Sequence, residues 1–158
     1  MCVPRVKHYL QREGYYHLTT RTLKGEHAFA SDEAKRTVVD ALESCRKAGR
    51  WRVHAFVVMA NHVHVVVSDT GIGLQEAVRD FKKWVWHEVR GLGNGSLWER
   101  RYDDNAIGSV HEMRVVAEYV HNNPVRIGLV RRPEDYFWSS ARNYAGLEPV
   151  AMEVDRAW

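Results

Sequence analysis

His62 and His64 are separated by one residue within the segment Asn-His-Val-His-Val-Val-Val at positions 61–67. Successive side chains of a β-strand point to opposite faces, so this spacing places both imidazoles side by side on one face. Two neutral imidazoles in that arrangement can bind one metal ion. The same pattern also occurs on ordinary strands whose histidines are hydrogen-bonded within the fold. The prediction of a metal site therefore needs support from a second group of residues.

Tyr119 and Asn123 form that second element. They are four residues apart, so on a helix the phenol and the amide project from the same side. Together with the two imidazoles, one amide oxygen would leave positions on Mg²⁺ or Mn²⁺ open for phosphate oxygens and water. The alternatives are a tyrosine at the edge of the core and an ordinary helix end at Asn122-Asn123-Pro124.

Such a site suits phosphodiester chemistry. The metal would polarise the scissile phosphate while the oxygen of Tyr119 attacks in line, giving a phosphotyrosine ester. A free phenol has a pKa of about 10, so attack at neutral pH requires help from the metal or from a base. Glu118 and His121 are nearby candidates for that base. The ester conserves the energy of the broken bond, so a 3′-hydroxyl can rejoin DNA without ATP, and the sequence has no Walker-type glycine loop.

Basic and aromatic residues alternate after position 80 and could bind nucleic acid. Phosphates would contact the basic side chains, whereas unpaired bases would stack on the aromatic rings, which favours single-stranded or hairpin DNA. The alternative is that the aromatic residues are core anchors and the charges are merely solvated. The candidates are Lys82, Lys83, Arg100 and Arg101 for phosphates, and Trp84, Trp86, Trp98 and Tyr102 for bases.

The periodicity of apolar residues predicts an α+β, ferredoxin-like fold, with an antiparallel sheet and helices packed mainly on one face. Ser31 begins the first helix, Ser109 and Glu112 form a capping box for the third, and Pro124 is expected to end that helix. We predict strands over 15–21, 51–58, 62–68 and 105–107, helices over 31–49, 74–90 and 109–123, and a short helix within 136–146.

Length and composition fit one domain over residues 1–158, with less ordered ends at 1–13 and 148–158. The formal charge of +3 is too small to identify a partner by electrostatics alone. Cys2 and Cys45 form no Cys-x-x-Cys pair, which indicates a reducing compartment such as the cytoplasm. No apolar run approaches the roughly 20 residues of a membrane span, so no membrane association is expected.

The chain resembles the REP-associated tyrosine transposases, which are single-tyrosine transposases of the HUH superfamily. The resemblance extends from about Tyr15 to Tyr144 and includes several ordered blocks. These are Gly-Tyr-Tyr-His-Leu-Thr-Thr-Arg at 14–21, His-Ala-Phe-Val-Val-Met-Ala-Asn-His-Val-His-Val-Val-Val at 54–67, Leu-Trp-Glu-Arg-Arg-Tyr-Asp at 97–103, Tyr-Val-His-Asn-Asn-Pro-Val-Arg at 119–126 and Trp-Ser-Ser at 138–140.

The resemblance implies that His62, His64 and Asn123 bind the metal and that Tyr119 is the nucleophile, although Asn122 is an alternative third ligand. It further implies single-stranded DNA with hairpin ends, of the REP palindrome type, as the partner of a monomer or homodimer at the nucleoid. Ala60 departs from the proline that relatives often carry before the histidines, which should change the stiffness of the turn rather than the ligands. The chain also ends soon after the Trp-Ser-Ser block, so fewer DNA-recognition contacts are expected.

Two other functions fit the same residues. A domesticated descendant could bind hairpin nucleic acid with the same sheet and basic helix without cleaving it. A plasmid-type relaxase or replication initiator would share the chemistry but normally occurs in a longer chain. The leading hypothesis is a metal-dependent transposase that cleaves single-stranded DNA through Tyr119 and rejoins it.

Overall fold

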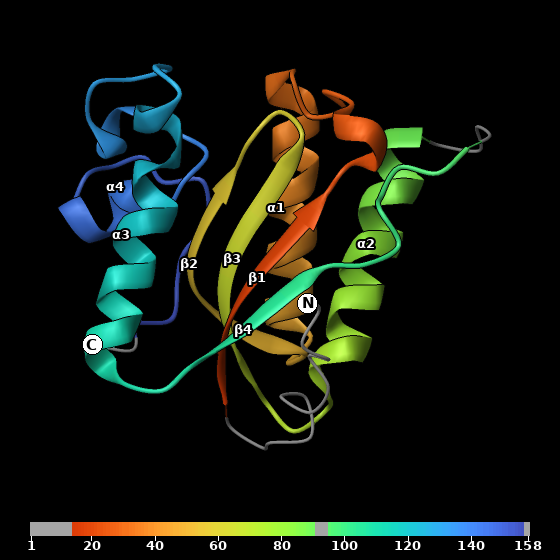
Figure 1. Ribbon diagram of the computed structural model, residues 1–158, viewed down its shortest axis with the longest axis horizontal. Coiled ribbons are helices and arrows are strands. Elements are labelled where there is room, and N and C mark those ends of the chain that lie inside the picture. The colour runs from red at the N-terminus through yellow and green to blue at the C-terminus, as the bar shows by residue number, and fades with distance from the viewer. Residues whose placement is uncertain (1–13, 91–94, 157–158) are drawn as a thin grey trace, which may run out of the picture.

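The computed structural model describes residues 14–90 and 95–156. One four-stranded sheet and four α-helices make up most of this part of the chain (Figure 1). The elements are β1 (Tyr15–Arg21), η2 (Leu23–Gly25), α1 (Asp32–Lys47), β2 (Trp51–Val58), β3 (His62–Asp69), α2 (Leu74–Arg90), β4 (Asp103–Ile107), α3 (Val110–Arg126), η3 (Pro133–Asp135) and α4 (Ala141–Ala145).

The sheet has the strand order β2-β3-β1-β4, and every pair of neighbouring strands is antiparallel. The first six long elements follow the order β-α-β-β-α-β of a ferredoxin-like fold. The predicted α+β class is therefore confirmed. β1 lies in the interior of the sheet between β3 and β4. None of the described helices is both long and apolar enough to cross a membrane.

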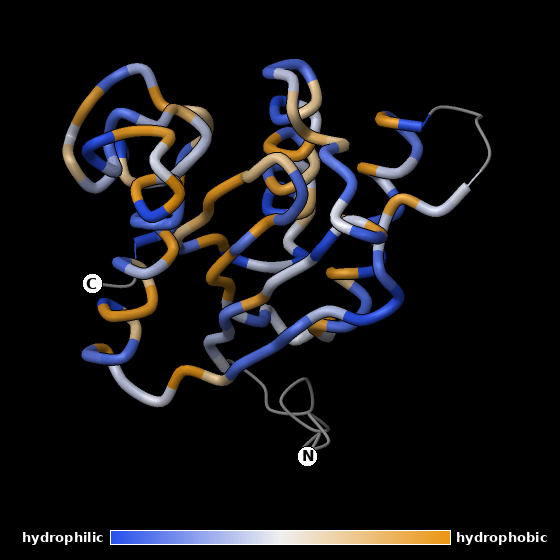
Figure 2. Tube along the Cα trace, turned by 45° about the horizontal axis from the view of Figure 1, so that its top comes forward, coloured by the Kyte–Doolittle hydropathy of each residue, from blue (hydrophilic) through white to orange (hydrophobic). Residues whose placement is uncertain are grey.

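Helices cover both faces of the sheet. α1 and α2 pack together on one face over a large apolar cluster that includes Leu18, Phe56 and Phe81. α3 packs on the opposite face over a smaller cluster (Figure 1). Nearly all residues of β2 and β3 are buried, whereas β4 is a hydrophilic edge (Figure 2).

α3 continues through a proline that was expected to end it. The helix extends to Arg126 and includes Pro124, so Tyr119 lies two turns before its end and not at its terminus. Proline removes one hydrogen bond from a helix, but Val120, Asn123 and Pro124 are all buried on the face that packs against the rest of the protein. Tertiary packing therefore outweighs the local preference, and the predicted helix end was wrong.

The segment from 148 to 156 is packed against the domain, which corrects the prediction of a less ordered end there. Ala151 and Met152 are buried in the large apolar cluster. Asp155 accepts hydrogen bonds from the Val53 N–H at 3.0 Å and from Arg46 Nε at 2.9 Å. Sequence periodicity cannot reveal such irregular packing. The other predicted end, positions 1–13, and positions 157–158 lie outside the described residues.

We predict that Asp155→Ala lowers the free energy of unfolding by about 2 kcal/mol at pH 7. The substitution leaves Arg46 Nε and the Val53 N–H without their acceptor. Burial alone would raise the pKa of Asp155, but the bonds from Arg46 and Val53 hold that pKa below its usual value. Urea denaturation compared with Glu153→Ala, an exposed carboxylate in the same segment, measures the difference. Equal stability of the two variants would show that the contacts of the Asp155 carboxylate contribute nothing.

Candidate active site

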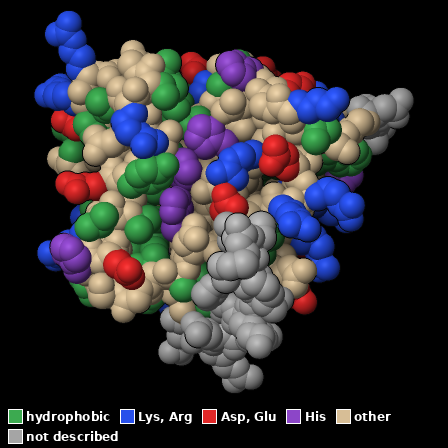
Figure 3. Space-filling view, viewed as in Figure 1, with side chains coloured by type: hydrophobic (Ala, Val, Ile, Leu, Met, Phe, Trp, Pro, Cys, Tyr) green, Lys and Arg blue, Asp and Glu red, His purple; other side chains and the backbone are tan. Residues whose placement is uncertain are grey.

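A polar cavity of about 360 Å³ opens where β1 and β3 face the C-terminal half of α3. It brings together all four residues predicted for catalysis and metal binding, from β3 and from α3. Its lining residues are Arg21, Thr22, Gly25, Asn61, His62, His64, Glu99, Tyr119, Asn123 and Arg126. Figure 3 shows histidine side chains gathered along the middle of this face, with basic side chains on either side.

His62 is oriented by its neighbour in the turn between β2 and β3. Its Nδ1 lies 2.7 Å from Asn61 Oδ1, which can only accept a hydrogen bond, so Nδ1 carries the proton. The lone pair of Nε2 is then available to a metal or a proton. Burial lowers the pKa of His62, and Asn123, as an acceptor for the protonated ring, opposes that shift.

His64 is oriented by β1, through Thr19 and His17, which are not among the predicted site residues. Its Nδ1 lies 3.0 Å from Thr19 Oγ1 and 3.0 Å from His17 Nε2. Thr19 is the direct partner of His64 in the β1–β3 register, and His17 is two residues along the same face. Both contacts engage Nδ1, so Nε2 of His64 is again the nitrogen left for a ligand.

Burial keeps the histidines of the cavity neutral. Burial, with smaller contributions from the nearby His17, His62, Arg21 and Arg126, lowers the pKa of His64 to about 3. Burial also lowers the pKa of His17. A neutral imidazole is the form that binds a metal, so at pH 7 the site requires no deprotonation before a divalent ion can bind.

Tyr119 is the exposed member of the site and Asn123 the buried one, with 43% and 3% of their surfaces accessible. The Tyr119 ring packs edge-on against His64 and His17, with ring centroids 5.7 Å and 6.0 Å away. The guanidinium of Arg126 lies 4.5 Å from its centroid. The phenol is therefore held beside the imidazoles and remains open to a large substrate.

The donor set fits a divalent metal that takes further ligands from its substrate. Asn123 Nδ2 is buried without a hydrogen-bond partner among the described residues, so the amide is retained at a cost that a role for its oxygen would explain. Asn123 lines the cavity and Asn122 does not. Within the described ranges no three His, Cys, Asp or Glu side chains are grouped as metal ligands, so two imidazoles and one amide would form the whole protein contribution.

Comparison with known proteins agrees with this geometry. A family model described as "Transposase IS200 like" matches residues 11–123. The chain belongs to the IS200-like transposase family. The matched range includes both histidines, the tyrosine and the asparagine, so the family match covers every residue of the predicted catalytic set.

Individual relatives are similar over much of the chain. The REP-associated tyrosine transposase of Escherichia coli (strain K12) is 28% identical over 112 residues, which are 66% of this chain and 64% of that protein. A solved structure of a REP-associated tyrosine transposase bound to a REP hairpin superposes with a TM-score of 0.77 at 21% identity, covering 98% of this chain and 93% of that one. A candidate transposase from Deinococcus radiodurans gives a TM-score of 0.51 at 21% identity, covering 77% and 97%.

Neither predicted base for this transposase-family chain lies in the cavity. His121 Nε2 is hydrogen-bonded to Ser140 Oγ at 2.7 Å, and burial lowers the pKa of His121 to about 4. Glu118 is exposed and lines a different depression, next to Tyr144. Both residues project from other sides of α3 than Tyr119 does, so the structure corrects that expectation.

The residues predicted to bind DNA lie apart from the cavity and differ in accessibility. Trp98 is buried between Phe29 and Phe81, so it is a core residue and cannot offer a face to a base. Tyr102 is partly buried against the same cluster. Lys82 donates to the carbonyl of Glu99 at 2.8 Å, whereas the exposed Lys83, Arg100 and Arg101 can still contact phosphates.

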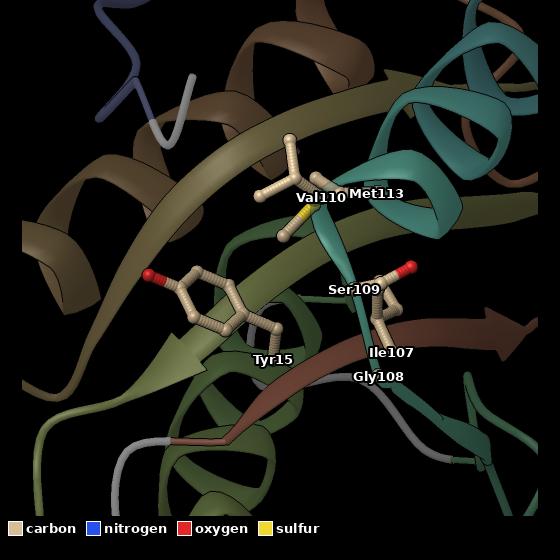
Figure 4. Close-up of a pocket in the computed structure, with 6 residues that line it drawn as sticks. All are labelled: Tyr15, Ile107, Gly108, Ser109, Val110 and Met113. Atoms are coloured by element: carbon tan, nitrogen blue, oxygen red, sulfur yellow. The ribbon is translucent and has the colours of Figure 1, made fainter.

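A second, apolar depression lies at the other end of the face between β1 and α3. Tyr15, Ile107, Gly108, Ser109, Val110 and Met113 enclose about 220 Å³ there (Figure 4). It contains none of the residues predicted to act on DNA. Its walls are the start of β1, the end of β4 and the first turn of α3.

We predict that the metal-free protein loses stability as the pH falls from about 6.5. The pKa of His64 in the folded protein lies well below its unfolded value of about 6.5, so the unfolded state binds a proton first as the pH falls. Stability therefore declines until about pH 3. At pH 5 this one group costs about 2 kcal/mol. Urea denaturation in chelator at pH 7 and pH 5 should show a smaller decline for His64→Asn, and an unchanged decline would contradict a buried neutral His64.

Proposed function

We propose that the protein is a metal-dependent transposase that cleaves and rejoins single-stranded, hairpin-flanked DNA through a 5′-phosphotyrosine intermediate at Tyr119. The observation that supports this proposal best is the exposed Tyr119 ring in contact with the buried, neutral His64, in a cavity that His62 and Asn123 also line. Membership of the IS200-like transposase family agrees with it. The proposal therefore assigns this combination to the HUH single-tyrosine type.

In this proposal each residue has a distinct task. His62, His64 and Asn123 would hold Mg²⁺ or Mn²⁺, which when bound polarises the scissile phosphate and offsets the charge that develops on it. Asn61, Thr19 and His17 keep the two imidazoles in fixed orientations. Tyr119 attacks phosphorus, its O–P bond forms as the bond to the 3′ oxygen breaks, and the departing 3′-hydroxyl can later reverse the step.

The hairpin partner is proposed from the similarity of fold. The matching solved structure is described as bound to a REP hairpin, and the fold of this chain follows it over nearly its full length. Exposed basic residues on α2 and after it, such as Lys83, Arg100 and Arg101, are available for phosphates of a stem. The match to the curated relative covers 64% of that protein's length.

We predict that Tyr119→Phe abolishes covalent attachment to DNA, because the variant retains the ring contacts but lacks the attacking oxygen. The measurement is a denaturing gel of protein with labelled single-stranded hairpins from the flanks of its gene, with Mg²⁺, Mn²⁺ or chelator. His64→Ala should also abolish the adduct, whereas Tyr144→Phe should leave it unchanged. Tight hairpin binding without an adduct in wild type would instead indicate a non-catalytic binding module.

We further predict that Mn²⁺ binds weakly to the protein alone and at least 10-fold more tightly when a hairpin is bound, because three protein ligands leave positions for phosphate oxygens. Calorimetric titration of the Tyr119→Phe protein with and without DNA measures both affinities. Asn123→Ala and His62→Ala should weaken binding, whereas His111→Ala, an exposed residue outside the cavity, should not. Unchanged affinity in His62→Ala would place the metal elsewhere.

A further inference from the structure

Arg126 carries the one positive charge of the cavity that no acidic side chain compensates within the described ranges. The other lining cation, Arg21, forms an ion pair with Asp103 at 2.7 Å. No ion pair is formed by Arg126 with any described residue, and its side chain is exposed. Its charge also reaches the two metal-binding candidates, because after burial it is among the causes that lower the pKa of His62 and of His64.

The helix places this cation directly over the nucleophile. Arg126 follows Tyr119 by seven residues and Asn123 by three, so all three lie on one face of α3. Long side chains on a helix lean toward its N-terminus, which brings the Arg126 guanidinium back over the Tyr119 ring at 4.5 Å. A guanidinium that stacks its flat face on an aromatic ring keeps the N–H donors at its edge for other acceptors.

We propose that Arg126 is a catalytic residue that binds a non-bridging oxygen of the scissile phosphate and aligns it with the oxygen of Tyr119. This role rests on the proposed DNA cleavage. Guanidinium groups bind phosphate oxygens through paired N–H donors, and here the donors occupy the same cavity as the phenol and the imidazoles. The contact with the ring fixes the distance between the cation and the attacking group, so the phosphate is held in line as it is bound.

The step balances without any further reactant. The bond from Tyr119 oxygen to phosphorus forms, the bond from phosphorus to the 3′ oxygen breaks, the phenol loses its proton to solvent and the 3′ oxygen takes one up. Arg126 remains protonated throughout, because a guanidinium does not titrate in this range. Its contribution is the stabilisation of negative charge on the phosphate oxygens in the transition state.

The test measures the single-turnover rate of adduct formation on two substrates. Arg126→Ala should slow attack on the normal phosphodiester by roughly 100-fold, the usual effect of removing one transition-state donor. Replacing one non-bridging oxygen of the scissile linkage by a methyl group creates two methylphosphonate isomers. In the isomer that lacks the contacted oxygen, wild type and Arg126→Ala should react at rates within about 3-fold of one another, since the lost donor has nothing to bind.

Two comparisons separate this role from others. Arg131→Gln removes one exposed charge outside the cavity and should leave the rate on the normal substrate unchanged. If Arg126→Ala reacts normally, or slows attack equally on the phosphate and on both isomers, Arg126 does not contact the phosphate and the proposed role is overturned. If wild type forms no adduct with any substrate while hairpins bind, the proposed cleavage itself fails and the role of Arg126 fails with it.

Discussion

The packing of α3 across β2 and β3 is the interaction on which the candidate site depends. Ala117 and Val120 enter the apolar cluster on that face of the sheet, together with Val57 and Val66. Their burial fixes the rotation of the helix, because residues one turn apart must then face a defined direction. Tyr119 consequently faces the mouth of the cavity. The proposed nucleophile and metal ligands are therefore brought together by the hydrophobic packing of other residues.

The second constraint is the register between β1 and β3. It places Thr19 directly opposite His64 and His17 next to it, so the central strand supplies the groups that orient one imidazole. A slip of one residue would turn those side chains to the other face, into the core beneath α1 and α2. The order of the sheet thus gives β1 a role in the site although it carries none of the residues predicted to react.

The elements and the four central residues could be predicted from the sequence because each depends on local spacing. Alternation defined β3 and its histidines, and the four-residue interval defined the pair on α3. The errors concern long-range packing. Pro124 continues a helix because its surroundings are buried, Trp98 lies in the core, and the segment around Asp155 is held by Arg46. His17 was expected to be a core or hydrogen-bonded histidine, but its partner His64 could not be predicted because that contact follows from strand register.

The proposed chemistry combines neutral imidazoles with an exposed tyrosine. Burial keeps the imidazoles in the form that binds metal, while the accessible phenol can meet a polymer that could not enter a closed pocket. The proposed chemistry requires that the covalent link to DNA forms at Tyr119. Tandem mass spectrometry of protease-digested adduct should find the nucleotide on the peptide at Tyr119, joined through a 5′-phosphate. A nucleotide on another tyrosine, or one joined through a 3′-phosphate, would rule out attack by Tyr119 with a 5′-phosphotyrosine product.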